Sequence, residues 1–477
     1  MHFTGRSREL GLLRRILDSR HPQLVRVWGL PGAGKSEVVR RAARDYRCIF
    51  HRCPPLPDPA QRTTLARGVR EALVDAGTAL DAWIAHDAAE TPTWRELFEG
   101  LLVCAAAVGH PLVLVLDDAH RLTEARARFT EPLRLAQVRA AQEGVAFHIV
   151  LIGPELTMTE TAEPTAETGA SPTQTALRIP PLPLRAAAPH LPGSRSADRV
   201  RAYGVFGGMP RVLAALDTSV TVGTNVRRLL LDESGALADA PLAWLERVVQ
   251  TPSRYVAILA TLAKGDADWG TLHAGVPDLT RSGQVAPYLK RLEDIGLIET
   301  RRSLDAGPRR RSTRYAITDP FVAFWFRFVF PWHLTETNEA IGPHYARAIR
   351  PGINDHMEEV LPRVCRQHME LDAIETLGAV ARESGSLWNA DTEIPVAGTL
   401  TSGAVYYGVS HWGKPSANAS PLDRLDAQVR ETRYGFGREG RLRLLFTGRP
   451  AQPWLRRDVA RRHDAKLIDA DALLGED

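Results

Sequence analysis

The stretch GLPGAGKS, from Gly29 to Ser36, fits the pattern G-x-x-x-x-G-K-[ST] in full. It follows the apolar run LVRVW and precedes the periodic stretch EVVRRAAR, so a strand, a tight turn and a helix are expected in that order. Glycines let the backbone aim several N–H groups at one phosphate, and the helix N-terminus favours its negative charge. The expected phosphate-binding residues are Gly29, Gly32, Ala33, Gly34, Lys35 and Ser36.

The choice of basic residues supports this interpretation of the loop. Of the 60 lysines and arginines only five are lysine, and Lys35 is the first of them, with no other before residue 264. A position that stays lysine in an arginine-rich chain indicates a need for a compact ammonium group. We expect Lys35 to reach the β- and γ-phosphates of ATP as a catalytic group, and Ser36 to hold Mg²⁺.

The run PLVLVLDDAH supplies a second half of the same site. A buried strand that ends in Asp117 and Asp118 places two carboxylates at the carboxyl edge of a parallel sheet, beside the phosphate loop. Asp117 suits a water-mediated contact to Mg²⁺, and Asp118 suits the positioning of an attacking water. Asp118 is therefore the second predicted catalytic residue.

Composition excludes several classes of protein. The 477 residues are 44% hydrophobic and 24% charged, which is ordinary for a globular chain of two to four domains. No apolar run approaches the roughly 20 residues needed to span a bilayer, and MHFTGRSREL lacks the core of a signal peptide. The four cysteines show no metal-ligand spacing. A cytoplasmic protein without a membrane partner is expected, and a net charge of +4 does not imply nucleic acid by itself.

The chain alternates short apolar runs with periodic stretches between residues 23 and 153, which predicts an α/β fold with a parallel sheet. Four strands are expected, at QLVRVWGL, RCIFHRC, PLVLVLDD and AFHIVLIG, with helices at 36–46, 61–76, 93–107 and 124–142. The Thr-, Ala-, Glu- and Pro-rich stretch 155–176 is expected to be a flexible loop. The predicted domains are 1–157, a loop at 158–176, a helical lid at 177–250, a winged helix at 251–333, and an α/β domain at 334–477.

Several motifs together resemble the STAND-type branch of the AAA+ ATPases. FTGRSREL, the phosphate loop, VLVLDDAH and VFGGMPRVL look like those of the archaeal and bacterial ATPase family in which this module precedes a winged helix and a nuclease-like tail. The resemblance implies that Phe3, Gly5 and Arg6 border the nucleotide and that Pro210 packs near adenine. It implies ATP and ADP as ligands, with Mg²⁺ as cofactor.

The chain departs from this family after the fourth expected strand. Relatives offer a small polar residue there that senses the γ-phosphate, whereas this chain has Gly153, Pro154 and Glu155. No clear arginine finger is visible among the many arginines. We therefore expect slow hydrolysis, with the nucleotide acting mainly as a switch.

Residues 252–319 combine amphipathic helices with an expected hairpin, LIETRRSL–DAGPRR–STRYAITD, which indicates a winged helix. YLKRLEDIGLI and RYAITDPFVAFWFRFV also match what the family carries after its ATPase. On such a wing, arginines contact DNA phosphates. The alternatives are a solvated turn or a contact with the chain's own nucleotide-binding domain. The candidate DNA-binding residues are Arg301, Arg302, Arg309, Arg310, Arg311 and Arg314.

The tail resembles the restriction-endonuclease fold with its metal ligands replaced. The family's aromatic–glutamate pair is Leu361–Pro362 here, and its Glu-Ile-Asp strand keeps Glu393 but has Pro395 in place of the aspartate. Its Glu-Cys-Lys-Trp strand end reads VSHW, from Val409 to Trp412. Proline and valine cannot bind a metal, and one carboxylate with one imidazole is a poor Mg²⁺ site. A degenerate PD-(D/E)xK nuclease-like domain is expected.

The leading hypothesis is a cytoplasmic, slowly hydrolysing ATPase whose nucleotide state controls the winged helix and an inactive nuclease-like module, associated with DNA through the wing and the basic tail. A protein partner or self-association is also open. One alternative is an ATP-dependent DNA nuclease. Another is an ATP-binding protein-interaction platform that does not bind nucleic acid.

Overall fold

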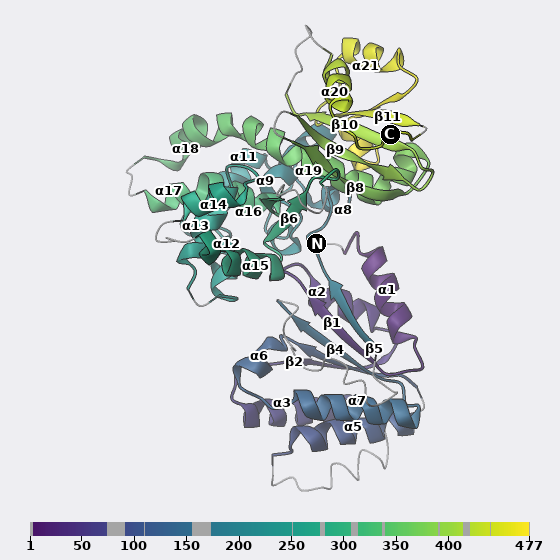
Figure 1. The fold of residues 1–477 in the computed structure, drawn as a ribbon. Helices are drawn as coiled ribbons and strands as arrows, with labels where there is room; N and C mark the ends of the chain where they lie inside the picture. Colours follow the sequence, from purple (N-terminus) through teal and green to yellow (C-terminus); the bar gives the residue numbers. More distant parts are fainter. Residues whose placement is uncertain are drawn as a thin grey trace. The chain divides into compact units, whose positions relative to one another are not determined.

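The structure is a computed structural model that describes residues 3–476, except for 74–90, 109, 155–172, 250, 277–281, 307–312, 336–338, 390–391, 414–419 and 439. Contacts group the chain into two compact units (Figure 1). The first unit comprises residues 6–180 and 294–296, and the second comprises residues 1–5, 181–293 and 297–477.

A parallel sheet forms the centre of the first unit, and its described strands have the order β2-β3-β4-β1-β5. Every neighbouring pair runs parallel, so the carboxyl ends of all these strands meet at one edge. Strands β3 and β4 are buried at every residue, as expected where helices cover both faces of a sheet. The strands are β1 (Gln23–Trp28), β2 (Arg47–Arg52), β3 (Leu112–Asp117), β4 (Phe147–Gly153) and β5 (Thr173–Arg178).

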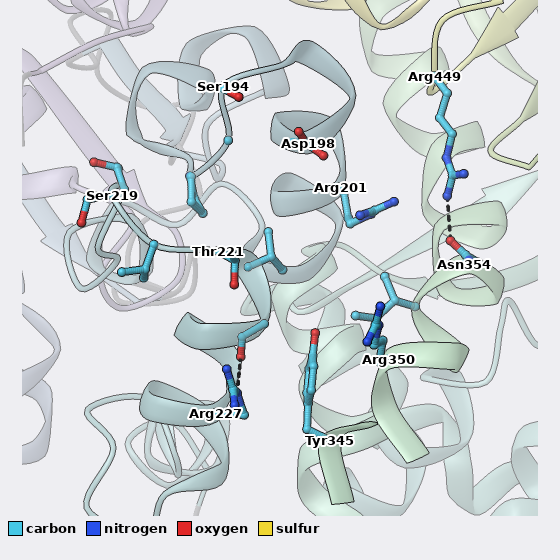
Figure 2. Close-up of a pocket in the computed structure, with 17 residues that line it drawn as sticks. Ser194, Asp198, Arg201, Ser219, Thr221, Arg227, Tyr345, Arg350, Asn354 and Arg449 are labelled. Atoms are coloured by element: carbon cyan, nitrogen blue, oxygen red, sulfur yellow. Dashed lines mark hydrogen bonds between the residues drawn. The ribbon is translucent and has the colours of Figure 1, made fainter. Parts of the chain in front are cut away.

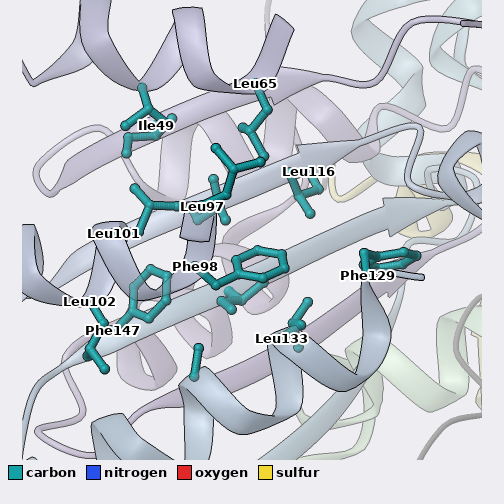
Figure 3. Close-up of a cluster of buried hydrophobic side chains, with 14 of the residues drawn as sticks. Ile49, Leu65, Leu97, Phe98, Leu101, Leu102, Leu116, Phe129, Leu133 and Phe147 are labelled. Atoms are coloured by element: carbon teal, nitrogen blue, oxygen red, sulfur yellow. The ribbon is translucent and has the colours of Figure 1, made fainter. Parts of the chain in front are cut away.

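Helices cover both faces of this sheet (Figure 1). One face packs against α3, α5 and α7, and their apolar side chains merge with those of the strands in one core (Figure 3). Helices α1 and α2 pack together on the other face. The described helices of the first unit are α1 (Ser7–Leu17), α2 (Lys35–Ala42), α3 (Asp58–Ala72), α5 (Trp94–Val108), α6 (His120–Glu124) and α7 (Thr130–Glu143).

The four strands predicted between residues 23 and 153 are confirmed, but two predictions nearby are wrong. The helix predicted over 124–142 begins only at Thr130, as α7, because Arg126 has a φ of 54°, which a continuous right-handed helix cannot contain. The loop predicted to run to residue 176 ends earlier, since β5 begins at Thr173 and pairs with β1. This strand is specified by the free edge of β1 rather than by its own polar composition. The rest of the predicted loop, 155–172, lies outside the described residues.

The helical part predicted at 177–250 opens the second unit, and its central helix is α9 (Ser196–Phe206). Helix α9 packs against three helices from later in the chain, α16, α19 and α22. The remaining described helical segments here are α8 (Leu184–Ala187), η3 (Ala188–His190), α10 (Pro210–Leu213), α11 (Val222–Val226), the π-helical η4 (Arg227–Leu231) and α12 (Ala240–Glu246).

Helices followed by an antiparallel hairpin occupy the next part, as the sequence predicts. The hairpin pairs β6 (Ile298–Arg302) with β7 (Thr313–Ile317), and Ala267 bridges to Tyr315 as a third strand position. The helices are α13 (Ser253–Leu262), α14 (Trp269–Gly275), η5 (Ser282–Val285) and α15 (Ala286–Asp294). The aromatic stretch after the hairpin is helical and largely buried, as α16 (Pro320–Phe324), the π-helical η6 (Trp325–Val329) and α17 (Phe330–Leu334).

A second sheet, with the described order β12-β11-β10-β9-β8, forms the C-terminal part of the second unit. Strands β8, β9 and β10 are antiparallel neighbours, whereas β11 and β12 run parallel to β10. Helix α19 contacts β8, β9 and β10, and α20 and α21 add their apolar faces to the core around Tyr407. The strands are β8 (Ala381–Trp388), β9 (Glu393–Leu400), β10 (Val405–His411), β11 (Arg441–Thr447) and β12 (Ala465–Ile468).

A long helix leads into this sheet. It consists of α18 (Ile341–His344), the π-helical η7 (Tyr345–Ile349) and α19 (Arg350–Leu377), and α19 continues through Pro362. The helices after β10, β11 and β12 are α20 (Pro421–Arg430), α21 (Pro453–Ala460) and α22 (Ala470–Leu474). Among the described residues, no helix combines the length and the apolar character that crossing a bilayer requires.

Asp319, at the start of α16, joins the aromatic helix to the Gly-Gly-Met-Pro segment. Its carboxylate is fully buried and accepts N–H groups from Phe321 (2.9 Å) and Gly208 (3.3 Å). Gly207 has a φ of 60°, and a Cβ there would lie 2.3 Å from the carboxylate oxygen. The contact therefore requires a glycine. Burial raises the pKa of Asp319 to about 6, although these hydrogen bonds oppose the shift.

Phe98 in α5 tests the core of the first unit. It is 0% exposed and stacks on Trp94 with ring centroids 5.8 Å apart, so Phe98→Ala should cost about 3–5 kcal/mol of the free energy of opening. Hydrogen exchange of peptides from β3, which shares this core, measures that loss locally. Val103→Ala, at a 49% exposed position of the same helix, should change exchange little, and equal effects of the two would contradict this account of the core.

Candidate functional site

The phosphate-binding loop connects β1 to α2 at the carboxyl edge of the parallel sheet. Gly29 has a φ of 146° and Gly34, at the N-cap of α2, has a φ of 88°, a conformation that side chains disfavour. A Cβ on Gly29 would lie 2.5 Å from the carbonyl oxygen of Ile179, so the backbone just after β5 also requires glycine there. The glycines of the sequence pattern thus occupy positions where the backbone of the loop favours or requires glycine.

Lys35 is the first residue of α2, and its ammonium folds back over the loop. Its Nζ donates to the carbonyl oxygens of Gly29 (2.8 Å) and Leu30 (3.0 Å). Burial lowers the pKa of Lys35 to about 8, while the negative charges of Asp117 and Asp118 oppose the shift. The lysine and the two carboxylates therefore share one electrostatic environment, as the parallel topology leads one to expect.

Asp117 ends β3 and Asp118 follows it directly, and β3 is separated from β1 by β4. Asp117 is 6% exposed, and its Oδ1 accepts the N–H of Asp118 (3.0 Å). Asp118 has a φ of 57°, a conformation that is uncommon for residues other than glycine and that turns the chain away from the strand. The two neighbouring acids thus differ in exposure and orientation, which fits two different roles.

Two arginines that the sequence interpretation missed hold Asp118. Arg52 places its Nε 3.1 Å from Oδ2 of Asp118, and a guanidinium nitrogen of Arg121 lies 3.8 Å from the same oxygen. Arg52 is the last residue of β2, which pairs with β3 so that Arg52 lies opposite Asp117. The sequence places Arg52 at the end of an expected strand. Its contact with Asp118 can be predicted only once the strand order is known.

Arg6 supports the phosphate-binding loop through its backbone carbonyls. It is 3% exposed, and its guanidinium donates to the carbonyl oxygens of Ala33 (3.0 Å) and Pro180 (2.7 Å) and pairs with Glu9 at 3.1 Å. Burial lowers the pKa of Arg6, although Glu9 opposes the shift. Arg6 thus links the loop, α1 and the end of the β5 segment.

The structure brings together most of the predicted nucleotide-binding residues in the first unit, namely Arg6, Gly29, Gly32, Ala33, Gly34, Lys35, Ser36, Asp117 and Asp118. Phe3, Gly5 and Pro210 belong to the second unit. There a Cβ on Gly5 would collide with Ala186, and Pro210 is the first residue of α10. Strand β4 ends at Gly153, beside Trp28, and Glu155 lies outside the described residues.

The donor set of the loop and β3 fits ATP with Mg²⁺. Ser36 offers a hydroxyl at the second position of α2, and Asp117 offers a largely buried carboxylate, which are oxygen ligands of the kind that Mg²⁺ prefers. The loop N–H groups and Lys35 supply the positive counterpart for phosphates. The residues present are therefore suited to both ligands.

The predicted DNA-binding arginines divide into three groups: those with partners within the second unit, one that is exposed, and those outside the described residues. Arg301 is held within the second unit, because it pairs with Asp266, donates to Oγ of Ser386 (2.7 Å) and lies over the ring of Trp388. Burial lowers the pKa of Arg301 to about 8.

Arg314 pairs with Glu393 at 2.9 Å and lies 4.9 Å from the Trp388 ring centroid. Arg302 is exposed. The remaining three, Arg309, Arg310 and Arg311, lie outside the described residues.

The hairpin itself packs on the C-terminal sheet. The N–H of Leu304 donates to the carbonyl of Ser386 (3.0 Å), and the N–H of Trp388 donates to Oγ of Ser303 (2.9 Å). The two hairpin arginines with described partners therefore face the chain's own β8 and β9. This contact differs from the alternative weighed in the sequence, which was a contact with the nucleotide-binding domain.

The three altered positions of the tail lie on α19, β9 and β10. The β9–β10 ladder runs to the pair Val396–Gly408 and stops before Pro395, which has no N–H to donate. The carbonyl of Pro395 instead accepts a hydrogen bond from Arg366 (2.8 Å). Burial lowers the pKa of His411. Within the described residues, no three His, Cys, Asp or Glu side chains gather as a metal site.

Comparison with known proteins identifies the first of these regions. Residues 2–141 match the family model described as AAA ATPase domain, which covers the phosphate-binding loop and Asp117 and Asp118. An uncharacterized protein of Methanocaldococcus jannaschii, MJECL04, is 24% identical over 226 residues. That alignment covers 46% of this chain and 48% of the relative, so the chain matches about half the length of this curated protein.

Similar solved structures include the Walker-type ATPase PABY2304 of Pyrococcus abyssi, with a TM-score of 0.47, 17% identity, and coverage of 67% of this chain and 95% of that one. The ORC2 protein of Aeropyrum pernix, in its ADPNP–ADP complexes, has a TM-score of 0.41 and 15% identity and covers 72% and 95%. The STAND protein PH0952 of Pyrococcus horikoshii has a TM-score of 0.32 and 13% identity and covers 78% and 51%.

The depressed pKa of Lys35 predicts pH-dependent ATP binding. The protonated ammonium binds phosphate, so affinity should be highest below pH 8 and should fall as the pH rises through about 8 towards 9. Calorimetric titration with ATP between pH 7 and 9 measures this dependence. Lys35→Arg keeps its charge across that range and should flatten the profile, so an identical decline in this variant would contradict the assignment.

Arg6 predicts an effect on binding through the shape of the loop. Arg6→Ala leaves the carbonyls of Ala33 and Pro180 without this donor, and an unsatisfied buried group costs about 1–3 kcal/mol. We expect ATP affinity to fall about tenfold or more in equilibrium titration. Arg8→Ala, at an exposed position two residues later, should bind like the parent protein, and unchanged affinity of Arg6→Ala would exclude this support role.

Proposed function

We propose that this chain is a slowly hydrolysing, ATP-dependent switch whose nucleotide state controls the winged helix and an inactive nuclease-like module in its second unit. The observation that carries the proposal is the geometry at one sheet edge. There Lys35 closes the phosphate loop while Asp117 and Asp118 lie close enough to shift its pKa. The AAA ATPase domain matched at residues 2–141 supports ATP as the nucleotide.

The chain's own residues would divide the work at this site. The loop N–H groups and Lys35 would hold the β- and γ-phosphates and balance their charge. Ser36 and Asp117 would hold Mg²⁺, which supplies charge neutralisation on the phosphate oxygens. Asp118 would orient the attacking water, and Arg52 would restrain the carboxylate that does so.

Slow hydrolysis is expected from two features of the site. Gly153 ends β4 at the same edge and has no side chain with which to contact a γ-phosphate. Asp118 is already paired with Arg52, so part of its capacity to accept a proton or orient water is engaged. Both features favour a protein whose output depends on which nucleotide is bound rather than on turnover.

Contacts within the second unit support the proposed control of the winged helix and the nuclease-like module. Asp319 joins the aromatic helix to the Gly-Gly-Met-Pro segment, and Arg301 joins the hairpin to Ser386 and Trp388 of the C-terminal sheet, so a change in one part would reach its neighbours. At the tail positions where relatives carry metal ligands, Pro395 and Val409 offer no oxygen ligand from their side chains. DNA would then be held by hairpin arginines such as the exposed Arg302, without being cut.

A second candidate function is favoured by a specific observation. The sequence predicts DNA contacts for Arg301 and Arg314. In the structure, Arg301 pairs with Asp266, and Arg314 pairs with Glu393 and lies over the ring of Trp388. If the hairpin serves only this internal contact, the chain is an ATP-binding protein-interaction platform that does not bind nucleic acid.

Nucleotide titration and hydrolysis assays test the ATPase part. Lys35→Ala should weaken ATP binding about 100-fold, because a charged partner of the phosphates is lost. Asp118→Asn should keep binding and lower the hydrolysis rate by about 10²-fold or more. Lys264→Ala, an exposed lysine in the second unit, is the matched control and should alter neither quantity. ATP binding that survives Lys35→Ala would reject the site.

The same proteins, mixed with duplex DNA with and without ATP, separate the candidate outputs. Salt-sensitive binding without cleavage supports the proposed switch. No affinity at any salt concentration supports the platform and rejects the DNA part. Plasmid cleavage with Mg²⁺ or Mn²⁺ that disappears in Glu393→Ala would reject the inactive module in favour of an ATP-dependent nuclease.

A further inference from the structure

The second unit contains a cavity of about 890 Å³ that is built from segments distant in the sequence (Figure 2). Its lining comes from the turn before α9, α9 itself, the segment around α11, the η7–α19 junction and the loop after β11. Its volume lies in the range of roughly 300–1,000 Å³ that is usual for small-molecule sites. All of its lining residues belong to one compact unit, and none of them belongs to the phosphate-binding loop.

Arginine dominates the charge of this cavity. Arg201, Arg227, Arg350 and Arg449 line it, and the acid among its lining residues is Asp198. Asp198 already pairs with Arg195, whose guanidinium lies 3.4 Å away. The cavity therefore carries an excess of positive charge that its own lining does not balance.

The arginines are positioned by aromatic rings and hydrogen bonds rather than by carboxylates. Arg201 and Arg449 both lie over Trp412, with their Cζ atoms 5.6 and 5.0 Å from its ring centroid. Arg449 also donates to Oδ1 of Asn354 at 2.9 Å, a contact drawn in Figure 2. Arg227 donates to the carbonyl of Gly223 at 3.3 Å and lies 5.8 Å from the Tyr345 ring. These contacts orient the guanidinium groups and leave their charge uncompensated.

Three further observations concern the charge and burial of these arginines. Burial lowers the pKa of Arg449 and repulsion from Arg201 adds to this shift, although Glu358 and Asp198 oppose it. Burial raises the pKa of Tyr345, while the charges of Arg227, Arg350 and Arg201 oppose the shift. Among the described residues, the Nε atoms of Arg201 and Arg449 are also buried without a hydrogen-bond acceptor. The partly buried guanidiniums of Arg201 and Arg449 are therefore costly unless an anion joins them.

We propose that this cavity binds a small organic anion that carries two or more phosphate groups, at a site separate from the ATPase site. Guanidinium groups suit phosphate because their planar N–H donors bind its oxygens in pairs. Arg201 comes from α9, Arg350 from the first residue of α19, and Arg449 from the loop after β11, so a ligand with several phosphates can meet more of these guanidiniums than a single phosphate can. The ring and hydroxyl of Tyr345 offer an uncharged surface for the organic part of the ligand.

Such a ligand would hold the helical segment 192–227 and the C-terminal sheet together. Arg201 and Arg227 come from the first, whereas Arg449 follows β11 of the second. A ligand that bridges them stabilises this arrangement by the free energy of its binding. The site therefore would let the second unit respond to a signal other than the nucleotide bound by Lys35.

Calorimetric titration of the full chain with inorganic tripolyphosphate tests the site. Lys35→Ala is included in every protein to weaken binding at the ATPase site. We expect one saturable site, and we expect Arg350→Gln and Arg201→Gln each to weaken it about tenfold or more. Arg350 is exposed, so its variant should fold normally. Arg347→Gln, on the same helix but outside the cavity, is the matched control and should bind like its parent.

Three outcomes would overturn the proposal. These are no binding of tripolyphosphate, binding that neither cavity variant changes, and binding that Arg347→Gln weakens as much as Arg350→Gln. A parallel titration with a 5′-phosphorylated oligonucleotide distinguishes the source of the phosphates. Tighter binding of the oligonucleotide, lost in the same cavity variants, would overturn the small-ligand assignment in favour of nucleic acid.

Discussion

The position of β1 between β4 and β5 is the constraint on which the first unit depends. A strand paired on both sides has a fixed end, and the loop after it has a fixed starting point. The parallel direction of β3 brings Asp117 and Asp118 to that same edge, with β4 between them and the loop. Burial in this loop lowers the pKa of Lys35, and the carboxylates of Asp117 and Asp118 oppose that shift because nearby negative charge stabilises the ammonium.

Much of the first unit could be read from the sequence because its signals are local. The glycine pattern from Gly29 to Ser36 and the apolar run ending in Asp117 each specify a strand together with the turn that it enters. Strand β5 escaped prediction because its polar residues are ordered by the edge of β1, which is a tertiary effect. Arg52 escaped it because its partner Asp118 is 66 residues away and is brought close only by the β2–β3 pairing.

The second unit was predictable in its elements but not in its contacts. The hairpin arginines form a pattern that suits a nucleic-acid surface equally well as an internal one. In the structure, Arg301 and Arg314 make internal contacts with Trp388 and Glu393. These partners lie more than seventy residues further along the chain. The arginine-lined cavity has no sequence signal for the same reason, since its residues come from five separate segments.

Helix α9 gives the second unit a common centre. It is buried along most of its length by α16, by α19 and by α22, which belong to the aromatic helix and to the C-terminal part. Removing the C-terminal part would uncover the side of α9 that packs on α19 and α22, where Met357 lies against Gly204 and Glu476 pairs with Arg199. Selection on folding alone would therefore preserve that part of the chain, whatever chemistry its sheet performs or has lost.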